Sequence, residues 1–260
     1  MPKKRFKLTL AYDGTAYNGW QTQAEGIPTV QDTCEKILAG IFGHPVNVQG
    51  SGRTDAGVHA KGQVAHFDAE TRMKPRAVLN ACNARLPHDI RVLRAARCAL
   101  KFHARFSALR KEYRYFIWND PVMPPDKRLY HAHILKPLDL AAMREAAAHF
   151  VGGHDFASFT ANAQREVKST VRMIYACEVS KRGKCFCLRV RGSGFLYKQV
   201  RSIAGFVLRV GGGEEKPDAA LELLNTAPTR TARVPSAPAC GLFLWRVWYR
   251  ARVEKNTQTT

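Results

Sequence analysis

The stretch SGRTDAGVHAKGQVAHFD, Ser51–Asp68, is the most informative part of this chain of 260 residues. Two glycines flank the segment Arg53–Ala56, and glycine permits backbone angles and close approaches that other residues do not. The residues after the loop follow a period-two pattern, which predicts a strand over Val58–Phe67. An Asp in a glycine-rich turn can also serve only to bond its own backbone. We expect Asp55 to be presented at the rim of a sheet, and the rest of the chain must decide its role.

Strand and helix patterns are mixed along the remainder of the chain. Strands are predicted at Phe6–Tyr12, Val46–Gly50, Val58–Phe67, Ile90–Cys98, Tyr113–Trp118, Arg172–Ser180, Lys184–Arg191 and Leu242–Tyr249. Helices are predicted at Val30–Phe42, Pro75–Asn83, Leu138–Val151, Leu196–Val210 and Asp218–Asn225. The second half repeats the order of the first, which predicts an α+β fold with largely antiparallel pairing. The expected units are residues 1–104, residues 105–250, and a polar, disordered tail at 251–260.

The charge of the chain favours a polyanionic partner. Lys and Arg number 41 against 21 Asp and Glu, a formal net charge of +20. Such a balance steers association with nucleic acid. Cations are also interleaved with aromatic residues near Tyr113 and Tyr197, an arrangement in which rings stack on bases and cations hold phosphates. In a strand, however, Tyr113 and Tyr115 share one face and Arg114 takes the other, so some of these residues belong to the core.

The cysteines and the N-terminus favour a cytoplasmic protein. The seven cysteines include no CxxC pair, and an odd number is a poor disulfide framework. Cys185 and Cys187 share a strand face but lack a second ligand pair, so we interpret them as small core residues rather than zinc ligands. The basic first residues are not followed by an apolar signal region. Neither secretion nor a membrane span is indicated.

Five segments together carry a resemblance to a known family. Ser51–Asp68 resembles, nearly residue for residue, the active-site motif of the bacterial tRNA pseudouridine synthase A family. Four more segments match in the family's order and with compatible spacing: Tyr12–Gln21, Phe102–Tyr115, Gly194–Arg201 and Gly241–Leu242. The resemblance extends over about residues 6–249. It implies two similar halves that share one sheet, with the active-site cleft between them.

The resemblance also implies a role for individual residues. Asp55 corresponds to the catalytic residue, Arg201 to its basic partner, Tyr113 to a tyrosine that stacks on the target uracil, Leu242 to an aliphatic wall of the pocket, and Arg53 to an arginine that handles the target nucleotide. Without the resemblance, Arg201 would fit a phosphate contact and Tyr113 a core aromatic. Turning uridine into pseudouridine needs no redox step and no external energy, so we expect neither cofactor nor metal. One ionised carboxylate shielded from water can act by attack or by moving a ribose proton.

The family acts as a homodimer on uridines 38, 39 and 40 of the tRNA anticodon stem-loop, so tRNA and a second copy are the implied partners. The target base must be flipped out of its stem at a cost of a few kcal/mol. Shape and phosphate contacts then do most of the selecting. The chain departs from the family at Tyr197-Lys198-Gln199 and at Cys240, where the family usually has His and Met, and Glu. His59 and His66 are interpreted as structural.

Two other classes of protein share some of these features. An RNA-binding protein without catalysis would have the charge and the aromatics but no need to keep Asp55, Tyr113 and Arg201 together. A metal-dependent nuclease or phosphatase acting through Asp13 and Asp55 would need several carboxylates, and the 21 acidic residues are spread thinly. We interpret Asp13-Gly14 instead as a hairpin turn.

Overall fold

The computed structural model describes residues 2–161, 169–226 and 229–250, so the predicted tail at 251–260 lies outside the described residues. One sheet carries ten strands in the order β4-β1-β3-β10-β5-β9-β8-β7, with β2 paired to β3 and β6 paired to β5. The strands are β1 (Lys3–Tyr12), β2 (Gln49–Gly50), β3 (His59–Glu70), β4 (Ile90–Cys98), β5 (Arg110–Asn119), β6 (Ala132–Ile134), β7 (Gly152–Asp155), β8 (Val171–Arg182), β9 (Cys185–Gly192) and β10 (Leu242–Trp248). The described pairings are antiparallel except β3 with β10 and β5 with β6, which confirms the predicted fold class.

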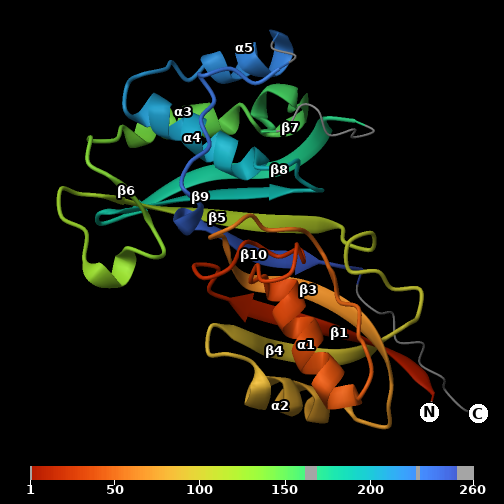
Figure 1. Cartoon of the computed structure of the whole chain (residues 1–260). Helices are drawn as coiled ribbons and strands as arrows, with labels where there is room; N and C mark the ends of the chain where they lie inside the picture. Colours follow the sequence, from red (N-terminus) through yellow and green to blue (C-terminus); the bar gives the residue numbers. More distant parts are fainter. Residues whose placement is uncertain (1, 162–168, 227–228, 251–260) are drawn as a thin grey trace, which may run out of the picture.

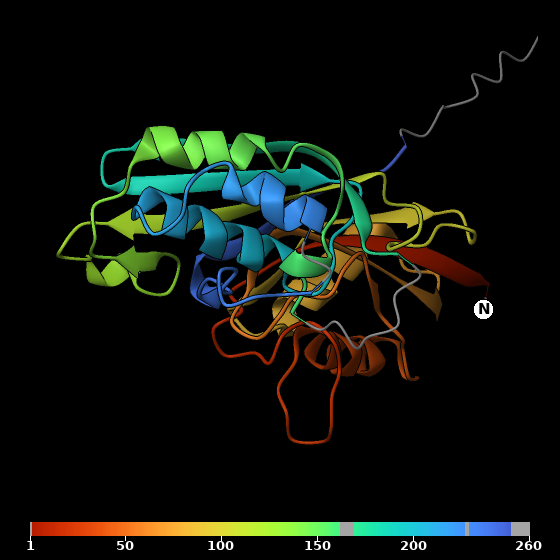
Figure 2. The ribbon, with the colours of Figure 1, turned by 90° about the horizontal axis from the view of Figure 1, so that it is seen from above.

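The helices gather in two groups, one for each half (Figures 1 and 2). They are α1 (Val30–Phe42), α2 (Pro75–Arg85), α3 (Leu140–Ala148), α4 (Gln199–Gly211) and α5 (Ala219–Thr226), with 3-10 turns η1 (Pro125–Lys127), η2 (Ala157–Phe159) and η3 (Ala239–Gly241). α1 shows how local signals set the ends: the hydroxyl of Thr29 accepts from the amide of Asp32, and Gly43 ends the helix with φ 74°. Helices α1 and α2 lie beside β1, β3 and β4, whereas α3, α4 and α5 lie beside the strands of the second half.

The last described strand, β10, lies between a strand of the first half and a strand of the second half. β10 runs parallel to the start of β3, with Leu244 beside Ala60, and antiparallel to β5, with Leu244 beside Tyr113. On the next strand, Val190 of β9 pairs with Tyr113. Paired residues in a sheet share a face, so these four side chains form one row across the joint. The start of β3, which follows the Asp loop directly, therefore lies two strand spacings from Tyr113, about 10 Å.

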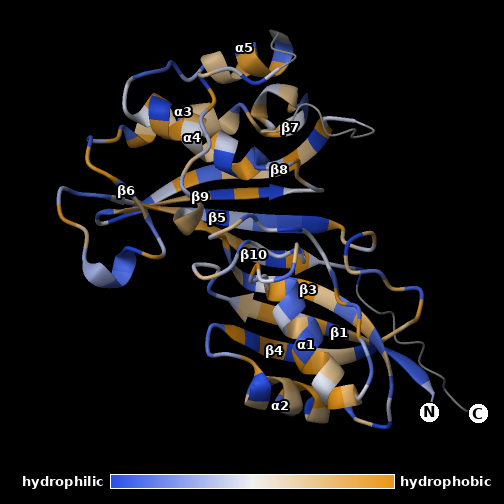
Figure 3. Ribbon diagram, in the orientation of Figure 1, coloured by the Kyte–Doolittle hydropathy of each residue, from blue (hydrophilic) through white to orange (hydrophobic). Residues whose placement is uncertain are grey.

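Hydropathy along the strands separates the core from the polar rim. In Figure 3 the ribbon is blue where β5 begins and where β9 ends, and orange segments recur along the strands. The central strand β3 is buried on both faces over most of its length. The strand predicted at Val58–Phe67 is therefore present at His59–Glu70, with little exposed surface on either face.

Two predicted strand features are wrong. Val46–Gly50 is a strand only at Gln49–Gly50, because the amide of Val48 donates to a side-chain oxygen of Glu35 at 2.8 Å instead of to a neighbouring strand. The predicted hairpin at Asp13-Gly14 is absent, since β1 leads through a long segment into α1.

The interpretation of Cys185 and Cys187 as core residues also needs correction. They share a face of β9, as predicted, but both are only partly buried. The fully buried face of this strand belongs to the alternate residues Phe186, Leu188 and Val190.

Candidate active site

Asp55 lies in a loop whose backbone is tied to the interior just before the carboxylate. Ser51 is fully buried, and its hydroxyl donates to Oε1 of Gln63 at 2.7 Å. Gln63, a buried residue of β3, donates from Nε2 to the backbone carbonyl of the residue that follows Ser51, at 2.8 Å. The hydroxyl of Thr54 lies 2.9 Å from that of Tyr12. These buried polar contacts fix the path of the chain into Asp55.

The Tyr12–Gln21 motif packs directly over this loop. The amide of Trp20 donates to the carbonyl of Thr54 at 3.0 Å. Gly19 has φ 90°, and a side-chain carbon there would lie 2.4 Å from the same carbonyl oxygen. At Gly14 such a carbon would lie 2.0 Å from the carbonyl oxygen of Val58. Only glycine permits these approaches, so the first motif is part of the support of the loop.

Arg201 meets Asp55 from the other half of the chain. Its Nη1 lies 3.0 Å from Oδ2 of Asp55, and the two side chains are 14% and 18% exposed. Arg201 is in the first turn of α4, and its Nε donates to the carbonyl of Ala237 at 2.8 Å. The amide of Ala237 in turn donates to the carbonyl of Arg201 at 3.0 Å. The site therefore has one carboxylate and one guanidinium, paired across 146 residues of sequence.

Tyr113 lies beside the same loop. Its side chain is buried, and its ring packs edge-on against Phe195 with centroids 5.2 Å apart. A side-chain carbon on Gly52 would lie 3.9 Å from the Tyr113 hydroxyl. Burial, followed by the neighbouring Tyr12 and the negative charge of Asp55, raises the pKa of Tyr113 above its usual value. The phenol is therefore neutral near pH 7, and its burial is compatible with both the core and the stacking interpretation.

The other two predicted site residues lie further from the ion pair. Arg53 is exposed at the rim of the loop, where its Nε donates to Oε1 of Gln21 at 3.0 Å. Among the described residues, no carboxylate forms an ion pair with it. Leu242 is buried at the start of β10 and pairs in register with Tyr115. Arg53 is thus available to a ligand, while Leu242 forms part of the apolar face.

His59 and His66 are placed as structural residues would be. His59 is fully buried, its ring stacks on Phe243 with centroids 4.6 Å apart, and burial lowers its pKa. Nδ1 of His66 accepts from the amide of Ala104 at 3.2 Å. Burial, then the positive charges of Arg5 and His103, lowers the pKa of His66 to about 4. Both rings are therefore neutral near pH 7.

The geometry does not support a metal site made of Asp13 and Asp55. The carboxylate of Asp13 accepts from the hydroxyl of Tyr130 at 2.6 Å and from that of Thr15, also at 2.6 Å, and it lies 3.1 Å from Nδ1 of His59. Asp55 is engaged by its guanidinium partner. Within the described part of the chain, three potential ligands do gather at Glu145, His149 and Asp218, and neither aspartate is among them.

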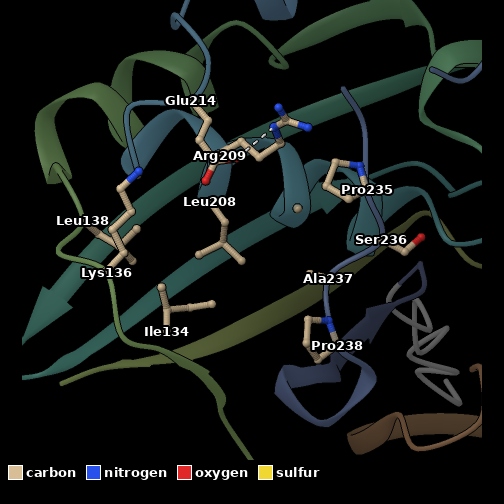
Figure 4. A pocket seen from close by; sticks show the side chains of 12 residues that line it. Ile134, Lys136, Leu138, Leu208, Arg209, Glu214, Pro235, Ser236, Ala237 and Pro238 are labelled. Carbon is tan, nitrogen blue, oxygen red and sulfur yellow. Dashed lines mark ion pairs between the residues drawn. The ribbon is translucent and has the colours of Figure 1, made fainter. Parts of the chain in front are cut away.

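A pocket further along α4 does not include the ion pair (Figure 4). Gly205, one helical turn after Arg201, lets the segment of Pro235 pack so closely that a side-chain carbon would lie 2.1 Å from the proline carbonyl oxygen. The pocket extends beyond this contact, between Leu208 and Ile134. The segment 235–238, which holds Arg201, forms one wall of this pocket.

The sequence of the chain matches a known family of proteins. The model of a family described as tRNA pseudouridine synthase matches residues 9–107 and 146–250. The chain belongs to this family. The tRNA pseudouridine synthase A of Exiguobacterium sibiricum is 44% identical over 248 residues, covering 95% of this chain and 97% of that one. That of Bacillus subtilis is 45% identical over 247 residues, covering 94% and 99%.

A more distant likeness is found among solved structures. A chain in the "Crystal structure of the archaeal box H/ACA sRNP Nop10-Cbf5 complex" is 15% identical, with a TM-score of 0.33 over 78% of this chain and 44% of that chain. So low a score adds nothing to the assignment. The sequence matches alone confirm the family expected from the five motifs, and they favour an isomerase over the two other classes.

The two departures from the family pattern lie next to Arg201 and Leu242. Lys198 precedes α4 with φ 56°, the single positive φ outside glycine among the described residues. Gln199 is fully buried, and its Oε1 accepts from the amide of Leu196 at 2.8 Å. Cys240 is partly buried, with Sγ 3.4 Å from a backbone carbonyl oxygen of His131. Both stretches therefore border residues of the predicted site.

Sequence reasoning missed the residues that support the Asp loop. Gln63 and Ser51 are buried polar residues inside an otherwise apolar region, and such residues need partners. Lys111 is a half-buried lysine two residues before Tyr113 in β5. For Gln63 the available signal was its polar side chain in the middle of the predicted strand Val58–Phe67, whereas Lys111 lies outside the predicted strand Tyr113–Trp118. Among the described helices the longest have 13 residues, and none could span a membrane.

Proposed function

We propose that this chain converts uridine to pseudouridine at positions 38, 39 and 40 of the tRNA anticodon stem-loop, with Asp55 as the catalytic carboxylate. The observation that carries the proposal is the ion pair of Asp55 with Arg201 at 3.0 Å, with Tyr113 buried beside the same loop. Membership of the family supports tRNA as the substrate. The resemblance in the five motifs supports the three positions.

The reaction needs few catalytic groups beyond an ionised carboxylate with a paired cation. The bond from ribose C1′ to uracil N1 breaks, a bond from C1′ to C5 forms, C5 loses a proton and N1 gains one. No electrons are exchanged with another molecule. Covalent attack and removal of a ribose proton both require an ionised carboxylate with little access to water. Asp55, 18% exposed and paired with a fixed cation, meets that requirement.

The neighbouring residues fit roles in holding the target nucleotide. Tyr113 offers a neutral ring next to the carboxylate, which suits stacking on a flipped uracil. Arg53 is exposed at the rim and can reach the space that the base leaves in the stem. In this proposal Leu242, buried at the start of β10, forms the aliphatic wall beside the target base. The net charge of +20 supplies the attraction to the RNA backbone.

The proposal includes a homodimer, which rests on the resemblance. Light scattering of the purified chain should give a mass near twice 29.1 kDa. A monomeric mass at the protein concentration of the activity assay would remove the dimer from the proposal and leave the chemistry untouched.

Tritium release tests the reaction and the role of Asp55 together. An unmodified tRNA transcript labelled at C5 of uridine is incubated in chelator with the wild type or with Asp55→Asn. We expect release by the wild type and a turnover lower by about 10⁴-fold for the variant, with tRNA affinity retained. Mapping pseudouridine at single-nucleotide resolution then tests positions 38, 39 and 40.

The same experiment separates the alternatives. Binding without release by the wild type would favour a non-catalytic RNA-binding protein, and strand cleavage that stops in chelator would favour a nuclease. Normal release by Asp55→Asn would show that the site assignment is wrong.

A further inference from the structure

The side chain of Lys111 contacts the backbone of the loop that carries Asp55. Lys111 is the second residue of β5 and lies two residues before Tyr113, so both side chains point to the same face of the sheet. Its Nζ donates to the carbonyl of Ser51 at 2.6 Å. A side-chain carbon on Gly52 would lie 3.3 Å from this nitrogen. The ammonium group therefore sits against the backbone that leads into Asp55.

This partly buried cation has no anionic partner among the residues that the structure describes. Among the described residues, no carboxylate lies within ion-pair distance of Lys111. The nearest one in sequence, Glu112, points to the opposite face and accepts from Nε of Arg114 at 2.9 Å. Asp55 is already paired with Arg201. Both of these carboxylates are therefore engaged elsewhere.

The charged neighbour that Lys111 does have is another cation. Burial, followed by the positive charge of Arg105, lowers the pKa of Lys111 to about 8. Arg105 is exposed on the loop between β4 and β5, with its guanidinium 5.6 Å from the ring of Phe106. That ring is 76% exposed. The chain beside Arg105 is tied to the same part of the sheet as Lys111, because the amide of Ala104 donates to His66 at 3.2 Å and the amide of Ser51 donates to the carbonyl of Val64, two residues before His66. A half-buried cation without an anion raises the free energy of the empty site, and a bound anion would relieve it.

We propose that Lys111 and Arg105 form a subsite for a backbone phosphate of the RNA, next to the nucleotide that Asp55 acts on. The proposal rests on the proposed function, because the polyanion that supplies the phosphate is the tRNA substrate. Lys111 uses one N–H on Ser51, and its remaining donors match the acceptor oxygens of a phosphate. Its contact with the Asp loop places the phosphate beside the reacting nucleotide.

Salt dependence of tRNA binding distinguishes this role from a purely structural one. Each phosphate that a protein neutralises adds about one to the slope of log affinity against log salt. Dissociation constants for the unmodified transcript are measured from low to moderate salt with wild type, Lys111→Met, Lys111→Arg and Arg105→Met. The control is Lys181→Met. Lys181 pairs with Phe186 across the β8–β9 hairpin, and six residues of strand, about 20 Å, separate it from the level of Lys111.

We expect Lys111→Met and Arg105→Met each to lower the slope by about one and to weaken binding about tenfold at low salt. Lys111→Arg and Lys181→Met should keep the wild-type slope. Arg105 is exposed, so its variant tests the subsite even if Lys111→Met does not fold.

An unchanged slope in folded Lys111→Met and in Arg105→Met would overturn the subsite, and Lys111 would then only position the loop. Tritium release by the wild type in the same buffers tests the proposed function separately. If the wild type releases tritium while both variants keep the wild-type salt slope, the phosphate subsite is wrong and the proposed function stands.

Discussion

The loop that carries Asp55 and the helix end that carries Arg201 are held by different kinds of contact. The loop is fixed by buried side chains, among them Gln63 and Tyr12, and by a segment that packs on it through Gly19. Arg201 is held mainly by backbone groups of the 235–238 segment. Residues of the first half thus set the direction in which the Asp55 carboxylate points, whereas the second half supplies the positive charge of Arg201 beside it. Variants in the two regions should therefore fail in different ways.

The largest effect is expected at the pair itself. Arg201→Met should lower turnover by about 10²- to 10³-fold, because the carboxylate loses its fixed countercharge in a shielded site. Arg201→Lys, which keeps the charge on a different shape, should lose less. Turnover is measured by tritium release under single-turnover conditions.

Combining the variants shows whether Arg201 acts through Asp55. The double variant Asp55→Asn with Arg201→Met should be no slower than Asp55→Asn alone, since the cation then has no carboxylate to serve. Independent, multiplying losses would mean that Arg201 contacts the substrate instead, as the phosphate interpretation holds.

Gly19 and Gly26 offer a matched test of how the loop is held. Both have positive φ, 90° and 84°, but a side-chain carbon at Gly26 meets nothing within 4 Å. Gly26→Ala should therefore cost only the backbone strain, about 1 kcal/mol of unfolding free energy, with normal turnover. Gly19→Ala adds a clash with Thr54 and should cost about 3 kcal/mol and reduce turnover as well. Denaturant unfolding and tritium release measure both, and equal losses at the two sites would contradict the role of the contact.

The sequence predicts the elements far better than the contacts between them. The period-two and helical patterns are local, so they locate β5, α1 and α4 to within a few residues. The position of β10 between β3 and β5 depends on pairing over more than a hundred residues, which no local pattern contains.

The same limit applies to the site. Asp55 and Arg201 could be paired from the motifs, because the resemblance carries the long-range information. Lys111 could not, because its partner in the loop is a backbone carbonyl, and backbone carbonyls look alike in every sequence. Val48 shows the reverse case, in which a bond to one side chain, that of Glu35, removes the first residues of a strand that the pattern predicted.

A buried histidine makes the stability of the first half depend on pH. His66 is 4% exposed, and burial lowers its pKa to about 4, against 6.5 in the unfolded chain. The unfolded state therefore binds more protons between these values, and stability falls as the pH falls from 6.5 toward 4. From pH 7 to pH 5 this one group should cost about 2 kcal/mol of unfolding free energy.

His66→Asn isolates this contribution, since its side-chain oxygen can still accept from the amide of Ala104. Urea unfolding at the two pH values should show a drop smaller by about 2 kcal/mol in the variant. The other histidines are common to both proteins, so an identical drop would show that His66 is protonated in the folded state.

The smallest effects compare two hydroxyl groups, one on each side of the site. Tyr12 holds the Asp loop through Thr54 at 2.9 Å, and Tyr115 holds the Arg201 side through the carbonyl of Pro238, also at 2.9 Å. Both side chains are buried, so Tyr12→Phe and Tyr115→Phe should each cost about 1 kcal/mol of unfolding free energy.

Their effects on turnover should nevertheless differ. Thr54 is bonded directly to Asp55, whereas Pro238 reaches Arg201 only through Ala237. A small shift of the loop misplaces the reacting carboxylate, while a small shift of the segment changes only the distance to a charge, on which the interaction depends weakly. Tyr12→Phe should lower turnover about tenfold and Tyr115→Phe by less than about threefold. A larger loss in Tyr115→Phe, at equal stability, would mean that the second half also sets the direction of the carboxylate.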